Sequence, residues 1–218
     1  MVIPALNEAA VLPATLAALT GADEIVVADG GSGDATVTIA EAAGARVVSA
    51  RGRAAQQNVG AAATTAPILL FLHADTRLPV GWADEVCHIL ADSRVALGAF
   101  RLSIDGATPA ERLIAAGANL RSRSWGVPYG DQALFLRRAT FEALGGFPDQ
   151  PIMEDWALAR AARRFGRIQL SPLAVTTSPR RWRKLGPLRT LVINQAMLMG
   201  GRLGVPYDRL ASWYQKAR

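Results

Sequence analysis

The chain of 218 residues contains little cysteine, little charge and few aromatic side chains. Its single cysteine, Cys87, excludes an intramolecular disulfide, so the sequence does not demand an oxidising compartment. Charged residues make up only 19% of the chain against 50% hydrophobic residues, a balance that excludes a disordered protein. No apolar run reaches the roughly 18 uninterrupted residues expected of a membrane-spanning helix. These limits leave a folded protein with a sizeable core.

The N-terminus lacks the features of a signal peptide. Residues 1–22 are largely apolar, but they have no basic start and carry Asn7 and Glu8 early. We therefore interpret them as part of the folded protein. The strand expected at residues 1–3 is short, either because the strand is stubby or because the natural chain starts upstream.

The charges are unevenly distributed along the chain. The net charge is +6, yet residues 160–218 contain 13 basic residues and one acid, Asp208, so the preceding part is net negative. An acidic body with a basic tail indicates carboxylates that handle chemistry or a metal, and arginines that meet phosphate or an anionic surface. The alternative is a solvated, arginine-rich helical surface.

Short apolar runs alternate with alanine-rich segments of helical length in the first half of the chain. We expect strands at 1–3, 24–28, 46–48 and 68–72, and helices at 9–19, 35–43 and 54–64. This alternation predicts an α/β protein with a parallel, doubly wound sheet. Ligands of such sheets bind at the carboxyl ends of the strands.

The second half is less regular. We expect strands at 95–104 and 133–136, helices at 110–123, 138–144 and 155–165, and a mostly apolar segment at 188–205. The chain has no internal repeat and no linker. We therefore predict one domain, residues 1–185, and a helical C-terminal extension, residues 186–218, packed on the domain or at an interface.

Polar residues follow the expected strands. Asn7 comes after the first strand, where it can cap a helix. The run from Asp29 to Asp34 after the second strand contains three glycines, which permit either close approach of a ligand or a tight turn. This run has the spacing of neither a P-loop nor a dinucleotide-binding fingerprint, so both familiar phosphate cradles are disfavoured.

Three further groups of residues can carry chemistry. His73 and Asp75, two residues apart after the fourth strand, can hold a hard divalent cation or form a buried polar cluster. Glu154 and Asp155 open a helix, where they favour the helix dipole or supply a general base. The basic run at 180–184 surrounds a tryptophan and can clamp phosphate, stack on a sugar or cover the surface.

The order of these motifs resembles family 2 glycosyltransferases, in particular a small bacterial subgroup. The resemblance covers residues 1–165 and rests on Pro-Ala-Leu-Asn-Glu at 4–8, Asp-Gly-Gly-Ser-Gly-Asp at 29–34, His-Ala-Asp at 73–75, Gly-Gly-Phe at 145–147 and Glu-Asp at 154–155. Gly-Asp-Gln at 130–132 and Arg-Arg-Trp at 180–182 match the subgroup.

The resemblance implies a GT-A fold, Rossmann-like, with a mixed, mainly parallel sheet and flanking helices. It implies an inverting hexosyl transfer from a nucleotide-diphosphate sugar to a hydroxyl acceptor, assisted by Mg²⁺ or Mn²⁺, with Asp155 as general base. Asp75 and His73 would hold the metal. The residues implied for nucleotide binding are Pro4, Ala5, Glu8, Asp29, Asp34, Asn58 and Ala74. Those implied for donor sugar or acceptor are Asp131, Gln132, Glu154, Arg181 and Trp182.

Three positions depart from the family pattern. Gly30 stands where many members carry a second Asp, which weakens one nucleobase contact. His73 replaces the first Asp of the metal motif, and Ser178 stands where processive synthases have a Gln. With no membrane spans either, a processive polymer synthase is not expected.

The segment at 188–205 has a broad apolar face with arginines at its margins. It is either an interfacial helix that brings the site to a lipid-linked acceptor, or a helix packed on the domain or in a homodimer. The expected location is cytoplasmic, with peripheral contact at the inner face of the membrane as a further option.

Three other functions compete with sugar transfer. A nucleotidyltransferase has a similar sheet, but its usual basic, glycine-rich loop is missing after the first strand. A catalytically inactive nucleotide-sugar-binding protein is possible on the same fold, although both Asp75 and Asp155 are present. Nucleic-acid binding rests on the basic tail alone and is not expected.

Overall fold

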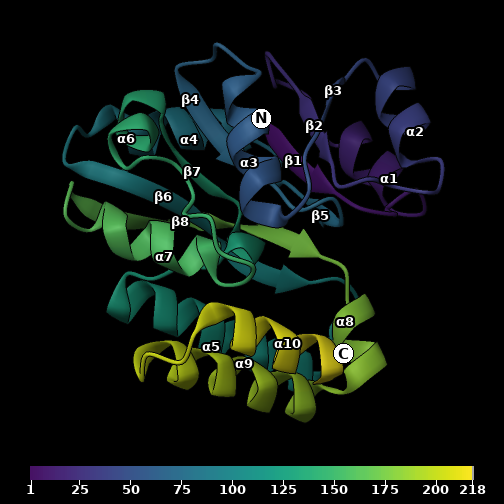
Figure 1. Cartoon of the computed structure of the whole chain (residues 1–218). Coiled ribbons are helices and arrows are strands. Elements are labelled where there is room, and N and C mark those ends of the chain that lie inside the picture. The colour runs from purple at the N-terminus through teal and green to yellow at the C-terminus, as the bar shows by residue number, and fades with distance from the viewer. Residues whose placement is uncertain (218) are drawn as a thin grey trace.

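The computed structural model describes residues 1–217, apart from the side chains of Arg181, Pro187 and Leu188. Within this part of the chain the strands form one sheet in the order β3-β2-β1-β4-β7-β6-β8-β5 (Figure 1). The strands are β1 (Val2–Ala5), β2 (Val26–Asp29), β3 (Arg46–Ser49), β4 (Ile68–Phe71), β5 (Thr76–Arg77), β6 (Val95–Ile104), β7 (Leu134–Arg137) and β8 (Arg167–Thr177).

The sheet is mixed. Strands β1 to β4 are parallel to one another, and β6 runs parallel to β8, whereas β7 is antiparallel to both β4 and β6 and β5 is antiparallel to β8. The mixed, mainly parallel α/β sheet predicted from the sequence is therefore confirmed.

The helices of the described chain flank this sheet. They are α1 (Leu12–Ala17), α2 (Thr36–Ala42), α3 (Arg53–Ala62), α4 (Trp82–Ala91), α5 (Pro109–Trp125), the 3-10 helix η1 (Gly130–Gln132), α6 (Arg138–Ala143), α7 (Glu154–Ala162), α8 (Arg180–Leu185), α9 (Pro187–Arg202) and α10 (Tyr207–Ala217). All elements expected in the first 72 residues are present, with ends shifted by a few residues. Our sequence interpretation missed α4, α8, β5 and β8, whereas α9 and α10 lie in the C-terminal extension that we expected to be helical.

Alternate residues of the central strands pack on opposite faces of the sheet. Ile3 and Leu70 belong to the core under α1 and α4, whereas Val2, Leu69 and Phe71 belong to the core under α3, α6 and α7. Both faces are covered, and this double burial explains why these strands read as continuous apolar runs. The two cores hold the carboxyl ends of β1, β2 and β4 at one edge of the sheet.

The C-terminal helices form a layer with α5 beneath the long strands β6 and β8 (Figure 1). Helix α9 contacts α5, α8 and α10. The packing of α9 on α10 is close: a Cβ at Gly200 would lie 2.6 Å from Leu210 Cδ2. None of the described helices is long and apolar enough to cross a membrane. The domain boundary at residues 185/186 stays a prediction.

Candidate active site

A cleft of about 700 Å³ lies between the carboxyl ends of the strands and the C-terminal helices. Its walls include many of the residues singled out from the sequence: Pro4, Glu8, His73, Ala74, Asp75, Asp131, Glu154, Asp155 and Trp182. Helices α8, α9 and α10 supply the remaining wall through Lys184, Asn194, Met197 and Tyr214, among others. The two acids on which the sequence interpretation depends, Asp75 and Asp155, thus face one cavity although they are 80 positions apart.

The geometry around Gly130 shows how closely two distant segments approach. The backbone N–H of Gly130 donates to Asp155 Oδ2 at 2.6 Å. A Cβ added at Gly130 would lie 3.0 Å from His73 Nε2 and 3.1 Å from Asp155 Oδ2. Asp155 Oδ1 accepts a second hydrogen bond, from the N–H of Trp156 at 2.7 Å. The carboxylate of Asp155 is therefore held in one orientation beside His73.

The acid next to it, Glu154, is buried, with 4% of its surface exposed. Met153 adopts a left-handed conformation (φ 65°) at the start of α7, and this turn directs Glu154 inward. Burial, followed by the negative charge of Asp155, raises the pKa of Glu154 to about 7, while Arg53, whose Nε lies 3.9 Å from Glu154 Oε1, opposes the rise. Glu154 therefore carries a proton for much of the time near neutral pH.

Arg180 links the ends of two strands. Its guanidinium NH2 group lies 2.7 Å from Glu8 Oε2 and 3.4 Å from Asp75 Oδ2. The N–H of Ser178 also donates to the carbonyl of Asp75 at 3.1 Å, which ties the end of β8 to this loop. Sequence reasoning placed no specific function on Arg180, because its partners lie 105 and 172 residues away.

The glycine-rich loop at 29–34 is fixed by its own side chains. Asp29 accepts hydrogen bonds from the N–H groups of Gly31 at 2.8 Å and Ser32 at 3.0 Å. Burial opposes the ionisation of Asp29, but these hydrogen bonds outweigh it and hold the pKa below its usual value. The carboxylate of Asp34 accepts from the N–H of Ala9 at 3.1 Å and from Thr36. Neither of these carboxylates, which the resemblance implied for nucleotide binding, lines the cleft.

A buried glutamine that the sequence interpretation missed holds the neighbouring strand ends. Gln56 Nε2 donates to the carbonyls of Ala5, at 2.9 Å, and Ala28, at 2.6 Å. Ala5 pairs with Asp29 in the β1–β2 ladder and does not itself line the cleft. Gln56 therefore connects the ends of β1 and β2, where Pro4 and Asp29 lie.

Two amides proposed for ligand contact are engaged elsewhere. Asn58 exchanges two hydrogen bonds with the backbone of Phe147, at 2.8 and 2.9 Å, and lies outside the cleft wall. Gln132 is fully buried; it donates to the carbonyl of Phe100 at 3.0 Å and accepts from Ser122 Oγ at 2.6 Å. Both side chains thus hydrogen-bond to backbone groups of the protein and do not line the cleft.

The aromatic residues of the cleft are firmly packed. Arg121 stacks on Tyr129, with its Cζ 3.6 Å from the ring centroid, and burial raises the pKa of Tyr129 to about 12. The phenol is therefore neutral at ordinary pH. Trp182 is 7% exposed and packs with Ile104 and Ala115 while one part faces the cleft. The side chain of Arg181 lies outside the described residues.

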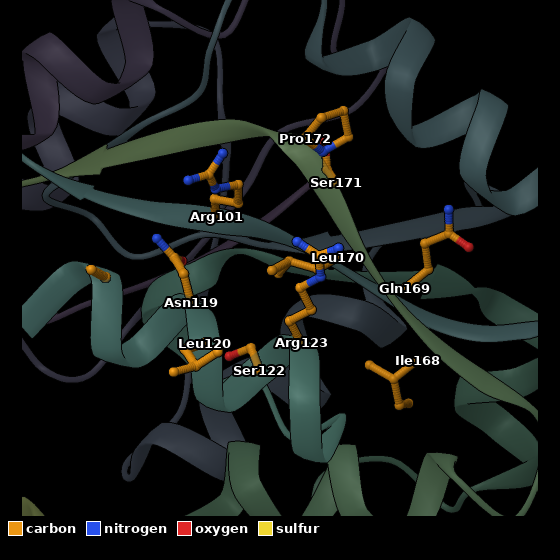
Figure 2. Close-up of a pocket in the computed structure, with 11 residues that line it drawn as sticks. Arg101, Asn119, Leu120, Ser122, Arg123, Ile168, Gln169, Leu170, Ser171 and Pro172 are labelled. Carbon is orange, nitrogen blue, oxygen red and sulfur yellow. The ribbon is translucent and has the colours of Figure 1, made fainter.

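A second cavity, of about 670 Å³, lies between α5 and β8 (Figure 2). Arg101 and Arg123 line it together with the apolar side chains of Leu120 and Leu170. Its described lining contains no Asp, Glu or His and shares no residue with the cleft. Without a general base it is not a candidate for catalysis, so the cleft is the candidate active site.

Two residues of the cleft wall, Asp75 and His73, are candidate ligands for a divalent cation. Among the described residues no group of three or more His, Cys, Asp or Glu could bind a metal ion. Asp75 and His73 supply two donors. Mg²⁺ typically takes one or two carboxylates, several waters and substrate phosphates, so this pair fits a cation that arrives with a diphosphate.

Solved structures of several glycosyltransferases share this fold. A fragment of S. aureus TarS has a TM-score of 0.64 and 17% identity, and the match covers 88% of this chain and 63% of that one. Glucosyl-3-phosphoglycerate synthase from Mycobacterium tuberculosis, solved with Mn²⁺, UDP and phosphoglyceric acid, has a TM-score of 0.63 and 22% identity over 94% of this chain and 78% of the other. The chain therefore spans less than two thirds of the TarS fragment.

A mannosyltransferase from Pyrobaculum calidifontis, solved with GDP-Man and Mn²⁺, is similar at a TM-score of 0.68 and 21% identity, covering 90% of this chain and 60% of that chain. These likenesses confirm the GT-A fold class. No curated protein matches the chain. The sequence profile that describes glycosyl transferase family 2 matches residues 1–145, which is more than half of the chain. The chain therefore belongs to glycosyl transferase family 2.

Proposed function

We propose that this chain transfers a hexosyl group from a nucleotide-diphosphate sugar to a hydroxyl acceptor, with inversion at the anomeric carbon and Asp155 as the general base. One observation carries the proposal: Asp155, His73 and Asp75 line a single cleft at the carboxyl ends of the strands, with Asp155 fixed by two backbone N–H groups. The neighbouring structures bound to UDP-GlcNAc, UDP and GDP-Man support a nucleotide-sugar donor.

Asp155 meets the requirements of a base in a direct displacement. The acceptor oxygen forms the new bond to the anomeric carbon, its proton passes to the carboxylate, and the diphosphate leaves with the electron pair of the old bond. Both oxygens of Asp155 already accept a backbone hydrogen bond, so the side chain needs little reorganisation. Because the pKa of Glu154 is raised to about 7, this side chain adds less negative charge beside Asp155 at neutral pH than a fully ionised acid would.

We assign the donor to the side of the cleft formed by the strand ends. Pro4, Glu8 and Ala74 line the cavity there, and Asp29 stands at the adjoining end of β2. Asp75 and His73 would hold Mg²⁺ or Mn²⁺ together with the diphosphate, and the cation would neutralise charge on the leaving group. The guanidinium of Arg180 lies within the same wall, where it offsets part of the negative charge of Glu8 and Asp75.

The opposite side of the cleft suits the acceptor. Asp131, Glu154 and Trp182 line it together with residues of α9 and α10. We propose a cytoplasmic location with peripheral contact at the inner face of the membrane and a lipid-linked acceptor. The basic character of residues 160–218 supports this assignment.

Thermal shift in a panel of UDP-, GDP- and dTDP-sugars, with and without Mn²⁺, tests donor binding. Turnover is then measured as release of the nucleoside diphosphate from the stabilising donor. Asp155→Asn should keep the donor-induced shift and lower turnover at least 10²-fold, because only the base is lost. Asp149→Asn, an exposed acid outside the cleft, is the matched control and should behave as the parent. Near-normal turnover of Asp155→Asn refutes the proposed base, and no shift with any donor refutes the proposed activity.

A further inference from the structure

Helix α9 presents an uncovered apolar stripe on its outer face. Val192, Met199 and Leu203 are 59%, 51% and 76% exposed, and Leu191 at the margin is 39% exposed. With 3.6 residues per turn, the first three lie within about 40° of one another around the helix axis. We call these four residues the α9 stripe. Soluble surfaces expose single apolar residues routinely, but an aligned set marks an interaction site.

The other side of α9 is packed. Met197 and Leu198 are buried and face the cleft, and Gly200 lies against Leu210 of α10. The side of α9 that packs on the rest of the chain is therefore a different side from the one that carries the stripe. In Figure 1, α9 lies at the lower edge of the molecule, on the side of the helical layer that is away from the sheet.

Basic residues border the stripe. Arg189 and Arg202 lie on either side of it on α9, and Arg209 and Lys216 are exposed on α10. Asp208 is the only acid between residues 180 and 217. Arg202 also lies with its Cζ 5.9 Å from the ring centroid of Trp125, itself 60% exposed.

We propose that the α9 stripe docks on an anionic lipid bilayer, with α9 parallel to the membrane plane. Apolar side chains flanked by arginine and lysine are the pattern of helices that lie in the membrane interface, where the basic residues meet anionic headgroups. A second copy of this chain is a poorer occupant. An isologous contact would bring two basic surfaces together with almost no acid between them, and like charges repel.

The orientation of α9 links this surface to the cleft. The same helix sends Asn194 and Met197 into the cleft wall while its opposite side carries the stripe. A bilayer seated on the stripe would therefore lie next to the wall that we assign to the acceptor. The docking names the surface for the peripheral membrane contact proposed above, and that the acceptor arrives from the bilayer rests on the proposed function.

Co-sedimentation with vesicles tests the docking without donor or acceptor. The protein should bind vesicles of phosphatidylcholine mixed with phosphatidylglycerol, bind phosphatidylcholine alone much more weakly, and release in high salt. The double variant Met199→Glu/Leu203→Glu should lose more than about tenfold in affinity, because both the apolar contact and the charge complementarity suffer. Arg202→Glu should lose at least about fivefold, the equivalent of about 1 kcal/mol for one basic residue at the surface.

Val80→Glu is the matched control, since Val80 is 99% exposed in the loop between β5 and α4. It should bind vesicles as the parent does. Equal binding by the stripe variants, or no preference for anionic vesicles, overturns the proposal. A lipid-free dimer in light scattering that Met199→Glu/Leu203→Glu dissociates would assign the stripe to a second copy instead. Donor-induced thermal shifts on the same variants report separately on the proposed function.

Discussion

Gly130→Ala should separate the geometry of the candidate active site from the stability of the fold. The added Cβ would lie 3.0 Å from His73 Nε2 and 3.1 Å from Asp155 Oδ2, so these side chains must move by a few tenths of an ångström. Gly130 does not have a left-handed φ, and its backbone therefore tolerates alanine. The fold should survive while the base is displaced.

The size of the effect follows from this displacement. A misplacement of about 1 Å at a reacting group costs roughly 10²-fold in rate. A shift of a few tenths of an ångström, together with strain on the 2.6 Å hydrogen bond from Gly130 to Asp155, should therefore lower kcat roughly tenfold. Donor affinity measured without a divalent cation should change little, because Pro4, Glu8 and Asp29 lie away from Gly130. With Mn²⁺ present, donor affinity also reports the displacement of His73, which we assign to the cation.

The assay measures nucleoside diphosphate release and, in parallel, the melting temperature. Gly117→Ala is the control, since Gly117 is exposed inside α5 and a Cβ there would meet nothing within 4 Å. It should keep kcat and gain about 0.5–1 kcal/mol in stability. If Gly130→Ala turns over like Gly117→Ala, the contact between Gly130 and Asp155 does not position the base and our reasoning about the cleft is wrong.

Two further predictions concern buried polar side chains. Because the pKa of Glu154 is raised from 4.5 to about 7, the folded protein binds more protons than the unfolded chain in this window, so stability should fall as pH rises from 4.5 to 7. Glu154→Gln should abolish this fall, worth roughly 3 kcal/mol, in thermal melts across the range; parallel curves for the two proteins would contradict the assignment. Asn58→Ala should cost about 1–3 kcal/mol through the lost bonds to Phe147 and leave the donor Kd unchanged. Weaker donor binding without a loss of stability would instead return Asn58 to the nucleotide site.

The parallel half of the fold could be predicted because each of its strands is recognisable from the residues of that strand alone. Strands β1, β2 and β4 are buried on both faces, so each is a continuous apolar run bounded by polar residues. Strand β8 was missed for the opposite reason. Arg167, Gln169, Ser171 and Pro172 interrupt its apolar pattern, and the strand is held by its long pairing with β6.

Residue type alone identified polar candidates for the site but could not say what each side chain contacts. An asparagine or glutamine offers the same donors and acceptors to a nucleotide and to the backbone. Asn58 and Gln132 satisfy backbone groups, whereas Asp75 and Asp155 remain in the cleft wall. The difference depends on contacts across 89 and 32 residues, which no local pattern encodes.

The antiparallel strand β7 explains how Asp155 reaches the side of the cleft where His73 and Asp75 lie. A purely parallel sheet would place only strand ends at the binding edge, and α7 would start at a distance from β4. Because β7 runs antiparallel beside β4, the segment that precedes β7 lies at the carboxyl end of β4, and Gly130 in that segment stands between His73 and Asp155. The antiparallel direction of β7 thus places the N–H of Gly130 where it donates to Asp155. Gly130→Ala tests whether this contact positions the carboxylate of Asp155.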